Sequence, residues 1–182
     1  MMSYITTYTE KHFDPLHPDA AQVDIRDIAH ALSLTCRGNG HVKTFFSVGQ
    51  HCINCALEAE QRGYTPKLVL ACLIHDASEA YMSDVPRPFK RYLPEYEKLE
   101  DEILEMIYGK FLGEMLTEEE EMLLKQIDND LLYYDLKVLL NEPTEGEAPK
   151  LHIPLNYEVL PFEQVERTYL ELYEKWSAGL KG

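Results

Sequence analysis

The segment Pro66–Glu79 constrains the fold most, because it is apolar on every side through LVLACLI at residues 68–74. Thr65 supplies an N-cap, and Pro66 suits the first helical position. A helix without a polar face has to be buried, so the pattern predicts a central helix surrounded by others. The run ends in the doublet His75-Asp76. Burying these two groups side by side is costly unless each finds a partner, and a divalent metal would supply one.

Helical periodicity continues on both sides of this central segment. Asp24 can cap a helix that runs to about Arg37, where Gly38-Asn39-Gly40 stops it. Ser47 and Thr117 each begin a capping box, with Gln or Glu three residues later. The other predicted helices run from Ser47 to about Arg62, Pro94 to about Leu112, Thr117 to about Leu140 and Phe162 to about Ser177.

The linkers complete an all-α arrangement. Pro86 and Pro88 predict a loop before the Pro94 helix, the polar segment 141–150 predicts a surface loop, and 151–157 predicts a short extended stretch. A chain of 182 residues fits one domain. We therefore expect a single helical bundle of about six main helices over residues 1–182, with a core over about 20–140 and a C-terminal helix over about 161–178 packed on it.

The net charge of -15, from 32 acidic and 17 basic residues, limits the kinds of molecule that the protein can bind. Such a field repels phosphate backbones, so we expect no nucleic-acid partner. A small phosphorylated ligand stays compatible, because a bound metal and a few cations can invert the charge within one site. The start of the chain lacks the regions of a signal peptide, and the longest apolar stretch is too short for a bilayer. We therefore expect a cytoplasmic protein with no membrane partner.

The four cysteines lie in apolar-patterned segments, and Cys52 and Cys55 form a CxxC. A CxxC suggests zinc binding or redox chemistry. No second CxxC completes a zinc site here, and residues three apart share a helical face. We therefore interpret this pair as small core residues.

Potential metal ligands fall on three of the predicted helices. His51 points inward by its helical spacing, His75-Asp76 closes the central helix, and Asp128 faces the core through its apolar neighbours. An inward histidine alone is more often a hydrogen-bonded core residue, and Asp130 competes with Asp128 within IDNDLL. Two neutral imidazoles and two carboxylates together match one divalent ion. Mixed nitrogen and oxygen donors suit Mn, Co, Fe, Ni or Zn better than calcium.

The ordered pattern His51, His75-Asp76, Asp128 resembles the HD-domain superfamily of metal-dependent phosphohydrolases, which are all-α proteins named for this doublet. The segments 27–51, 75–90 and 127–136 each resemble one bacterial and phage branch, related to the 5'-deoxynucleotidases that cleave nucleoside 5'-monophosphates. The resemblance covers residues from about 10 to about 140. It implies a single HD domain that holds one divalent ion, with Asp128 favoured over Asp130 because the spacing to Asp135 is kept. The implied metal ligands are His51, His75, Asp76 and Asp128.

Three further roles follow from the resemblance. Arg37 matches an arginine that contacts the substrate phosphate, a task that suits a guanidinium fork. Glu79 matches the glutamate of the HDxxE extension, and Asp84 matches the aspartate before a Val-Pro or Leu-Pro turn. Either is a catalytic acid or base, and the sequence leaves the choice open.

Structural explanations compete with each of these roles. Arg37 could be a solvated cation at a helix C-terminus, Glu79 a charge near a helix end, and Asp84 the start of the turn into Pro86. Other polar residues of these segments could equally lie beside the phosphate or on the surface: His41, Lys43, Arg87 and Lys90.

This sequence departs from the branch at three positions. The branch often has glycine where Ser83 stands, and glutamate where Gln50 and Asp135 stand. None of these changes removes an implied ligand, but a shorter side chain at Asp135 alters what can support one.

We expect an enzyme that releases phosphate from a nucleoside 5'-monophosphate or a similar small phosphomonoester. Two alternatives stay open: the same site acting on a triphosphate, cyclic or signalling nucleotide, and a non-catalytic regulatory domain that binds nucleotide or metal. The acidic helix from Pro94 and the aromatic last helix could form a homodimer interface, so the oligomeric state is also open.

Overall fold

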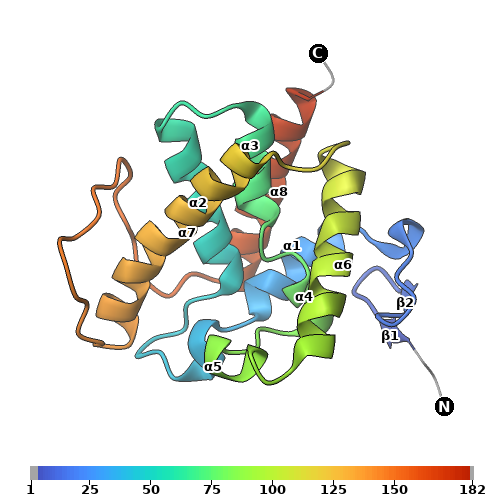
Figure 1. Ribbon diagram of the computed structural model, residues 1–182, viewed down its shortest axis with the longest axis horizontal. Coiled ribbons are helices and arrows are strands. Elements are labelled where there is room, and N and C mark those ends of the chain that lie inside the picture. The colour runs from blue at the N-terminus through green and yellow to red at the C-terminus, as the bar shows by residue number, and fades with distance from the viewer. Residues whose placement is uncertain (1–3, 181–182) are drawn as a thin grey trace.

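The structure is a computed structural model that describes residues 4–180, and it confirms the all-α fold class (Figure 1). The longer helices are α1 (Ile25–Leu34), α2 (Val48–Gln61), α3 (Pro66–Ile74), α6 (Pro94–Phe111), α7 (Glu118–Leu139) and α8 (Phe162–Ala178). The short ones are α4 (Glu79–Met82), α5 (Arg87–Lys90) and the 3-10 turns η1 (Ala20–Gln22) and η2 (Arg37–Gly40). Both predicted capping boxes form, at Ser47 and at Thr117.

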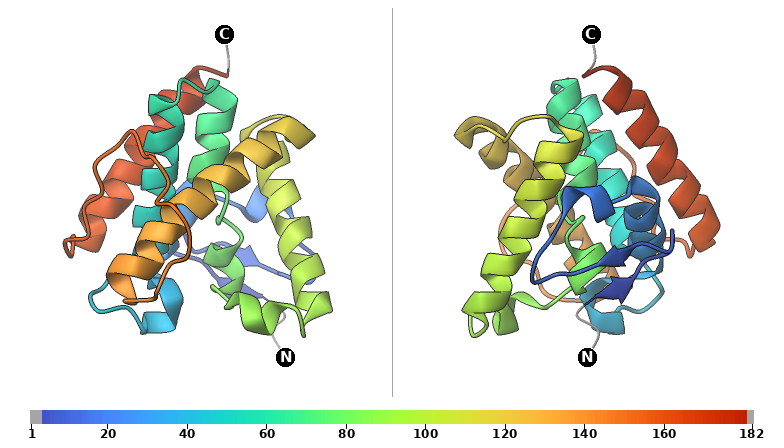
Figure 2. Two further views of the ribbon diagram at one scale, coloured as in Figure 1. Left: turned by 60° about the vertical axis from the view of Figure 1, so that its left-hand side comes forward. Right: turned by 90° about the vertical axis from the view of Figure 1, so that its right-hand side faces the viewer.

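Helix α3 occupies the centre of the bundle, as its sequence predicts. It packs against α2, α7 and α8, while α8 also lies along α1 (Figure 2). Every residue of Leu68–Ile74 is buried. Each buried leucine, isoleucine or valine in such a helix contributes roughly 1.5–3 kcal/mol relative to an exposed one. Helices α6 and α7 are joined by a short loop, and α7 packs against α3 (Figure 1).

Helix α3 ends at Ile74, earlier than the predicted end at Glu79. Two of its last carbonyls accept hydrogen bonds from side chains: Cys72 O from His75 Nδ1 (2.9 Å) and Leu73 O from the Tyr169 hydroxyl (2.7 Å). The last carbonyls of a helix have no backbone amide partner within the helix. Here the two side chains supply the donors that the amides of a further turn would otherwise provide. The chain therefore turns through residues 75–78 before α4, and Glu79 begins a separate short helix.

Helix α1 also ends early, at Leu34 rather than Arg37. Cys36 forms an antiparallel bridge with Ser47, and the Arg37 amide donates to Phe46 O at 2.9 Å. This strand-like pairing engages the backbone that the helix would have used. This pairing places Arg37 near the start of α2, beside the site described below.

A pair of short strands and a short helix were not predicted. Strands β1 (Ile5–Thr6) and β2 (His12–Phe13) form an antiparallel pair near the start of the described chain, with Ile5 opposite Phe13. Helix α5 lies where prolines predicted only a loop. Among residues 4–180, no helix combines the length and apolar character needed to cross a membrane.

Candidate metal centre

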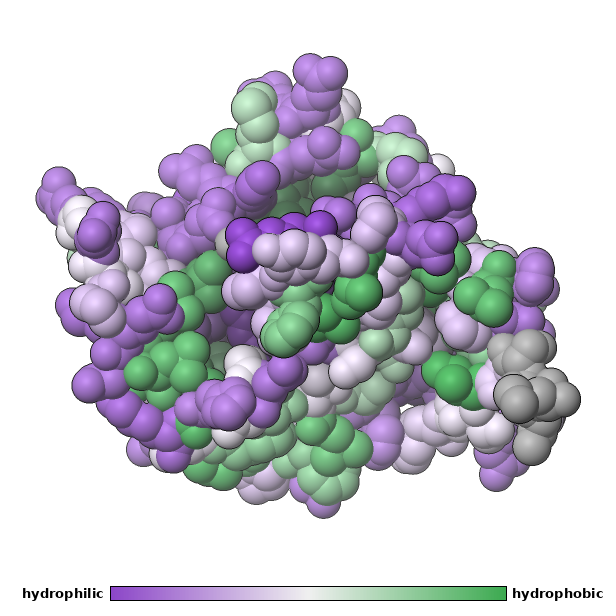
Figure 3. Space-filling model, turned by 60° about the horizontal axis from the view of Figure 1, so that its bottom comes forward, coloured by the Kyte–Doolittle hydropathy of each residue, from purple (hydrophilic) through white to green (hydrophobic). Residues whose placement is uncertain are grey.

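A pocket of about 480 Å³ opens where α7 faces η2, α4 and α5. Its polar side carries Arg37, Glu79 and Asp84 together with Asp76 and Asp128. Its apolar lining includes Leu132, Leu136 and Leu139, which lie on α7 with Asp128 and Asp135, and Leu140 at the end of that helix. On the face turned forward in Figure 3, hydrophobic and hydrophilic side chains lie side by side around a hollow. The pocket therefore offers charge and an apolar surface at once.

His51 lies at the back of this pocket, on α2, and is almost fully buried. Its Nδ1 is 3.0 Å from Asp135 Oδ2, and its Nε2 is 3.0 Å from Asp128 Oδ1. A neutral imidazole has one N–H, so it can donate to only one of these carboxylates. The other contact brings two acceptors together and requires a shared cation, which is either a second proton or a metal ion.

His75 follows α3 and faces His51, with 5.4 Å between the ring centroids. Its Nδ1 donates to the Cys72 carbonyl at 2.9 Å, which fixes the tautomer. Its buried Nε2 has no hydrogen-bond partner among the described residues, although Asp76 Oδ1 lies 3.3 Å away. Metal-binding histidines typically tie one ring nitrogen to a carboxylate or carbonyl and leave the other for the metal. His75 has that arrangement. His51 ties its Nδ1 to Asp135 in the same way, while its Nε2 contacts Asp128 Oδ1.

Asp128 projects from α7 toward both histidines, whereas Asp130 does not. Asp128 Oδ1 is 3.0 Å from His51 Nε2 and 3.8 Å from His75 Nε2. Burial alone would raise the pKa of Asp128, but the two imidazoles outweigh it and hold that pKa far below its usual range. Asp130 instead pairs with Arg62 Nη2 at 2.8 Å. The predicted set of His51, His75, Asp76 and Asp128 is therefore drawn together by the fold.

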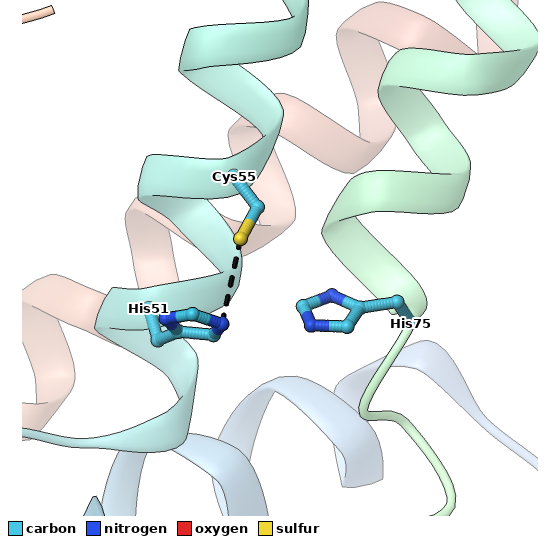
Figure 4. A group of neighbouring side chains, drawn as sticks. All are labelled: His51, Cys55 and His75. Carbon is cyan, nitrogen blue, oxygen red and sulfur yellow. Dashed lines mark hydrogen bonds between the residues drawn. The ribbon is translucent and has the colours of Figure 1, made fainter. Parts of the chain in front are cut away.

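Two cysteines adjoin this set. Buried histidine, cysteine and aspartate groups are positioned to hold a metal ion: His51, Cys55 and His75 form one group, and Cys52, His75 and Asp76 form another. Within each group the ligand atoms lie within 4.8 Å of one another. Figure 4 shows Cys55 and His51 on α2 directed toward His75. The cysteines are buried, as predicted for core residues, but their place beside the histidines was missed.

Arg37 reaches the pocket rather than solvent. Its Nη1 lies 3.5 Å from Asp76 Oδ2, and its Nη2 lies 3.4 Å from Asp135 Oδ2. The side chain is 15% exposed, so the alternative of a solvated helix-end cation is wrong. Both contacts are long for charge-assisted hydrogen bonds. A guanidinium held this loosely between two carboxylates can still bind a further anion.

Glu79 and Asp84 line the same pocket, and their environments differ. Burial, with the neighbouring Asp76 and Asp84 carboxylates, raises the pKa of Glu79 to about 9 in the metal-free chain. Glu79 Oε2 is buried without a hydrogen-bond partner among the described residues. Burial also raises the pKa of the more exposed Asp84 carboxyl. Both carboxyl groups therefore face the pocket, and Glu79 holds the more buried position.

The remaining basic candidates lie at different distances from the pocket. Lys90 lines it but pairs with Glu100 at 2.7 Å, and Lys43 bonds to Asn141 Oδ1 at 3.1 Å on the surface. His41 is exposed. The side chain of Arg87 falls outside the described part of the chain. Arg37 is therefore the one described arginine in the pocket lining.

Sequence reasoning missed how Asp135 is used. It raised Asp135 only as a shortened support position, whereas Asp135 bonds to His51 and Arg37 and accepts the Tyr157 hydroxyl at 3.0 Å. Tyr157 comes from the predicted extended stretch, and no local pattern marks it as part of the site. The helical spacing of Asp135 seven residues after Asp128 was the available signal.

No protein-family model matches the sequence. Over 112 residues the chain is 40% identical to the uncharacterized protein YfdR of Escherichia coli K12, a match that covers 60% of this chain and 59% of that protein. Over 106 residues it is 28% identical to an uncharacterized protein of Rhodobacter capsulatus, covering 56% and 54%. The chain thus matches between half and two thirds of the length of these relatives. Neither relative's name describes an activity, so the chemistry of the site has to carry the functional conclusion.

Proposed function

We propose that this protein is a metal-dependent phosphohydrolase that releases phosphate from a nucleoside 5'-monophosphate or a similar small phosphomonoester. The proposal includes membership of the HD-domain superfamily, which the ordered pattern of His51, His75-Asp76 and Asp128 resembles. The observation that carries the proposal is the similar pattern of contacts that the two histidines make. Each ties Nδ1 to an acceptor and directs Nε2 toward the carboxylates of the pocket.

The charge of the pocket supports a divalent ion as a partner of the phosphate. Its lining includes carboxylates from α4, α7 and the segments beside them, against the cations of Arg37 and Lys90. A phosphate dianion would be repelled by such a site unless a further cation were bound. We assign His51, His75, Asp76 and Asp128 to hold one divalent ion from the set Mn, Co, Fe, Ni or Zn. Such an ion supplies Lewis acidity for ester hydrolysis.

The chain's own residues supply the remaining chemistry. Arg37 neutralises charge on the phosphate oxygens. Glu79, which lines the pocket beside Asp76, is the first candidate to transfer a proton to the leaving oxygen. Asp84, nearer the opening, is the second candidate for this transfer. Positioning and electrostatics dominate phosphoryl transfer, so a covalent nucleophile is not required.

The leucines of α7 support an organic group on the phosphate rather than free phosphate. Leu132, Leu136 and Leu139 line the cavity on the same helix as Asp128 and Asp135. A flat base buries its faces well against aliphatic side chains. The cavity of about 480 Å³ lies within the range typical of small-molecule sites, roughly 300–1,000 Å³.

Phosphate release from ribo- and deoxynucleoside 5'-monophosphates, with Mn²⁺, Co²⁺ or Mg²⁺, tests the proposal. We expect release by the wild type and none by a His75→Ala/Asp76→Ala variant. Asp130→Asn, which changes an aspartate of α7 outside the pocket, serves as the matched control and should retain activity. Turnover of only triphosphates or cyclic nucleotides would move the activity to another substrate class. Nucleotide binding without any turnover would overturn the enzyme proposal in favour of a regulatory domain.

A further inference from the structure

Cys55 is a buried thiol that the proposed phosphohydrolase chemistry does not use. It lies on α2 four residues after His51, on the same helical face, and is 1% exposed. Its Sγ is 3.5 Å from His51 Nε2 (Figure 4). This is the nitrogen that also meets Asp128, not the one that Asp135 engages. The thiol therefore borders the metal-facing side of His51.

His75 supplies an independent observation at the same point. Its Nε2 is buried and has no hydrogen-bond partner within the described chain. The ligand atoms of His51, Cys55 and His75 lie within 4.8 Å of one another, and all three residues are buried. An unpartnered imidazole nitrogen aimed at a thiol and a second imidazole is what a nitrogen–sulfur metal site requires.

The sulfur–nitrogen distance fits two ligands of one ion. With metal–sulfur and metal–nitrogen bonds of about 2.3 and 2.05 Å, ligand atoms lie about 3.1 Å apart at right angles and about 3.6 Å apart at the tetrahedral angle. The 3.5 Å between Cys55 Sγ and His51 Nε2 falls inside this range. This distance is therefore compatible with both atoms binding the same ion.

We propose that Cys55 is a thiolate ligand of the metal centre, together with His51 and His75, and that the centre therefore selects a thiophilic divalent ion such as Zn²⁺ or Co²⁺ over Mn²⁺ or Mg²⁺. This inference rests on the metal centre of the proposed function. On binding, the Cys55 S–H proton is released to solvent and the sulfur lone pair forms the metal–sulfur bond. Carboxylates of Asp76 and Asp128 complete the donor set.

Co²⁺ titration of the metal-free full-length protein, followed by absorption spectroscopy, tests this assignment. A sulfur-to-cobalt charge-transfer band in the near ultraviolet reports a thiolate ligand, whereas the visible bands of Co²⁺ report binding of any kind. We expect both sets of bands in the wild type. The near-ultraviolet band should vanish in Cys55→Ala, and the affinity for Zn²⁺ in chelator competition should fall at least tenfold, while the visible bands persist.

Cys72→Ala is the matched control, because Cys72 is equally buried and lies outside both candidate metal groups. It should leave both sets of bands unchanged. Cys52→Ala tests the neighbouring group with His75 and Asp76. Loss of the near-ultraviolet band in Cys52→Ala but not in Cys55→Ala would overturn the assignment to Cys55.

The outcomes separate this inference from the proposed function. Visible bands without a charge-transfer band in the wild type would overturn the thiolate ligand and leave the metal centre standing. Absence of all cobalt bands would overturn the metal centre itself. If Cys55→Ala does not fold, X-ray absorption of the zinc-loaded Cys52→Ala variant decides the matter, because it removes the sulfur of the other candidate group. A sulfur neighbour at about 2.3 Å is expected, and a shell of only nitrogen and oxygen would contradict the proposal.

Discussion

Helices α2 and α7 bring charged side chains together in two places, and the two differ in how completely their polar atoms are satisfied. The Glu58 cluster consists of Glu58, Arg62, Asp130 and His152. Both carboxylate oxygens of Glu58 accept hydrogen bonds, from Arg62 Nε at 2.8 Å and from the backbone amides of His152 and Ile153 among others. This cluster is closed upon itself and has no further capacity for a ligand.

The proposed metal site, formed by His51, His75, Asp76 and Asp128, is incomplete by the same measure. His75 Nε2 is buried without a hydrogen-bond partner among the described residues. His51 contacts one carboxylate through each ring nitrogen, and a neutral ring can donate to only one of them. Glu79 Oε2, beside it, is also unpartnered among the described residues. Unsatisfied buried groups are costly and persist where function requires them. The contrast between the two places supports our proposal that the incomplete one binds a ligand.

Removal of a proposed metal ligand should give the largest loss of activity, and it tests the difference between the two places most severely. We expect Asp76→Ala to lower kcat/KM for phosphate release by about a thousandfold or more, roughly 4 kcal/mol of transition-state stabilisation. The fold should persist, because Asp76 lies in a partly exposed turn. Steady-state kinetics with circular dichroism measures both, and retained activity in a folded variant would remove Asp76 from the site.

The Glu58 cluster should respond in stability instead. Glu58→Gln removes the charge of a buried carboxylate that pairs with the Arg62 guanidinium and with His152, so we expect the free energy of unfolding to fall by about 3 kcal/mol. Denaturant titration measures this change, and phosphate release per folded molecule should be unchanged. A loss of kcat in the folded variant would show that the cluster serves the site after all.

The same cluster predicts a dependence of stability on pH. Burial would raise the pKa of Glu58, but hydrogen bonds from His152 and Arg62 outweigh it and lower that pKa below its ordinary value of 4.5. A lowered pKa means that the stabilisation is complete above pH 4.5 and is lost as the pH falls toward the folded-state pKa. Stability measured against pH should therefore fall less steeply in acid for Glu58→Gln than for the wild type. Identical slopes would contradict this.

Arg37 separates binding of phosphate from binding of metal. Arg37→Ala should lower kcat/KM about a hundredfold, the usual effect of losing one oxyanion donor. Arg37→Lys should recover part of the loss, because it keeps charge without the fork. Metal content should not fall in either variant. If it does, the arginine acts through Asp76 and Asp135 rather than on the substrate.

Asp135→Asn sharpens the account of how His51 is oriented. An asparagine can accept from His51 Nδ1 but no longer supplies a negative charge. We expect metal affinity to weaken by about ten- to a hundredfold, as is typical of groups behind a metal ligand. Chelator competition measures this affinity. An unchanged affinity would mean that the contact between Asp135 and His51 is only structural.

Ser83 should give the smallest effect. It holds φ 74 and ψ 159 in the turn between Glu79 and Asp84, a backbone region that strongly favours glycine. Ser83→Gly should raise the free energy of unfolding by about 1 kcal/mol. Ser83→Ala, which keeps the strain, is the control and should bring no gain. A gain in both variants would place the effect in the side chain instead of the backbone.

The sequence predicted the parts of the fold that depend on local chemistry. The capping boxes of α2 and α7 and the buried character of α3 are encoded within single segments. The end of α3 depends on the hydroxyl of Tyr169, and the end of α1 depends on the bridge between Cys36 and Ser47. Those partners are distant in sequence or require a tertiary turn, so no local pattern announces them.

The site shows the same limit. Helical spacing predicted that Asp128 faces the core. In the structure Asp128 contacts His51, whereas Asp130 pairs with Arg62. The cysteines of the CxxC were interpreted as core residues, and they are buried. Their closeness to His51 and His75 depends on how α2 and the end of α3 pack, which composition does not reveal. Helical spacing predicted which side chains face inward, whereas the packing of the helices determines which of them come into contact.

Metal content of the purified full-length protein tests the central claim most directly. Elemental analysis of wild type and His75→Ala, after dialysis against one buffer that contains a trace of each divalent ion, compares the two in a single experiment. We predict one divalent ion per wild-type chain and a content near zero in His75→Ala, with Asp130→Asn equal to the wild type. Equal metal content in wild type and His75→Ala, with both folded, would contradict a metal centre at His51, His75, Asp76 and Asp128.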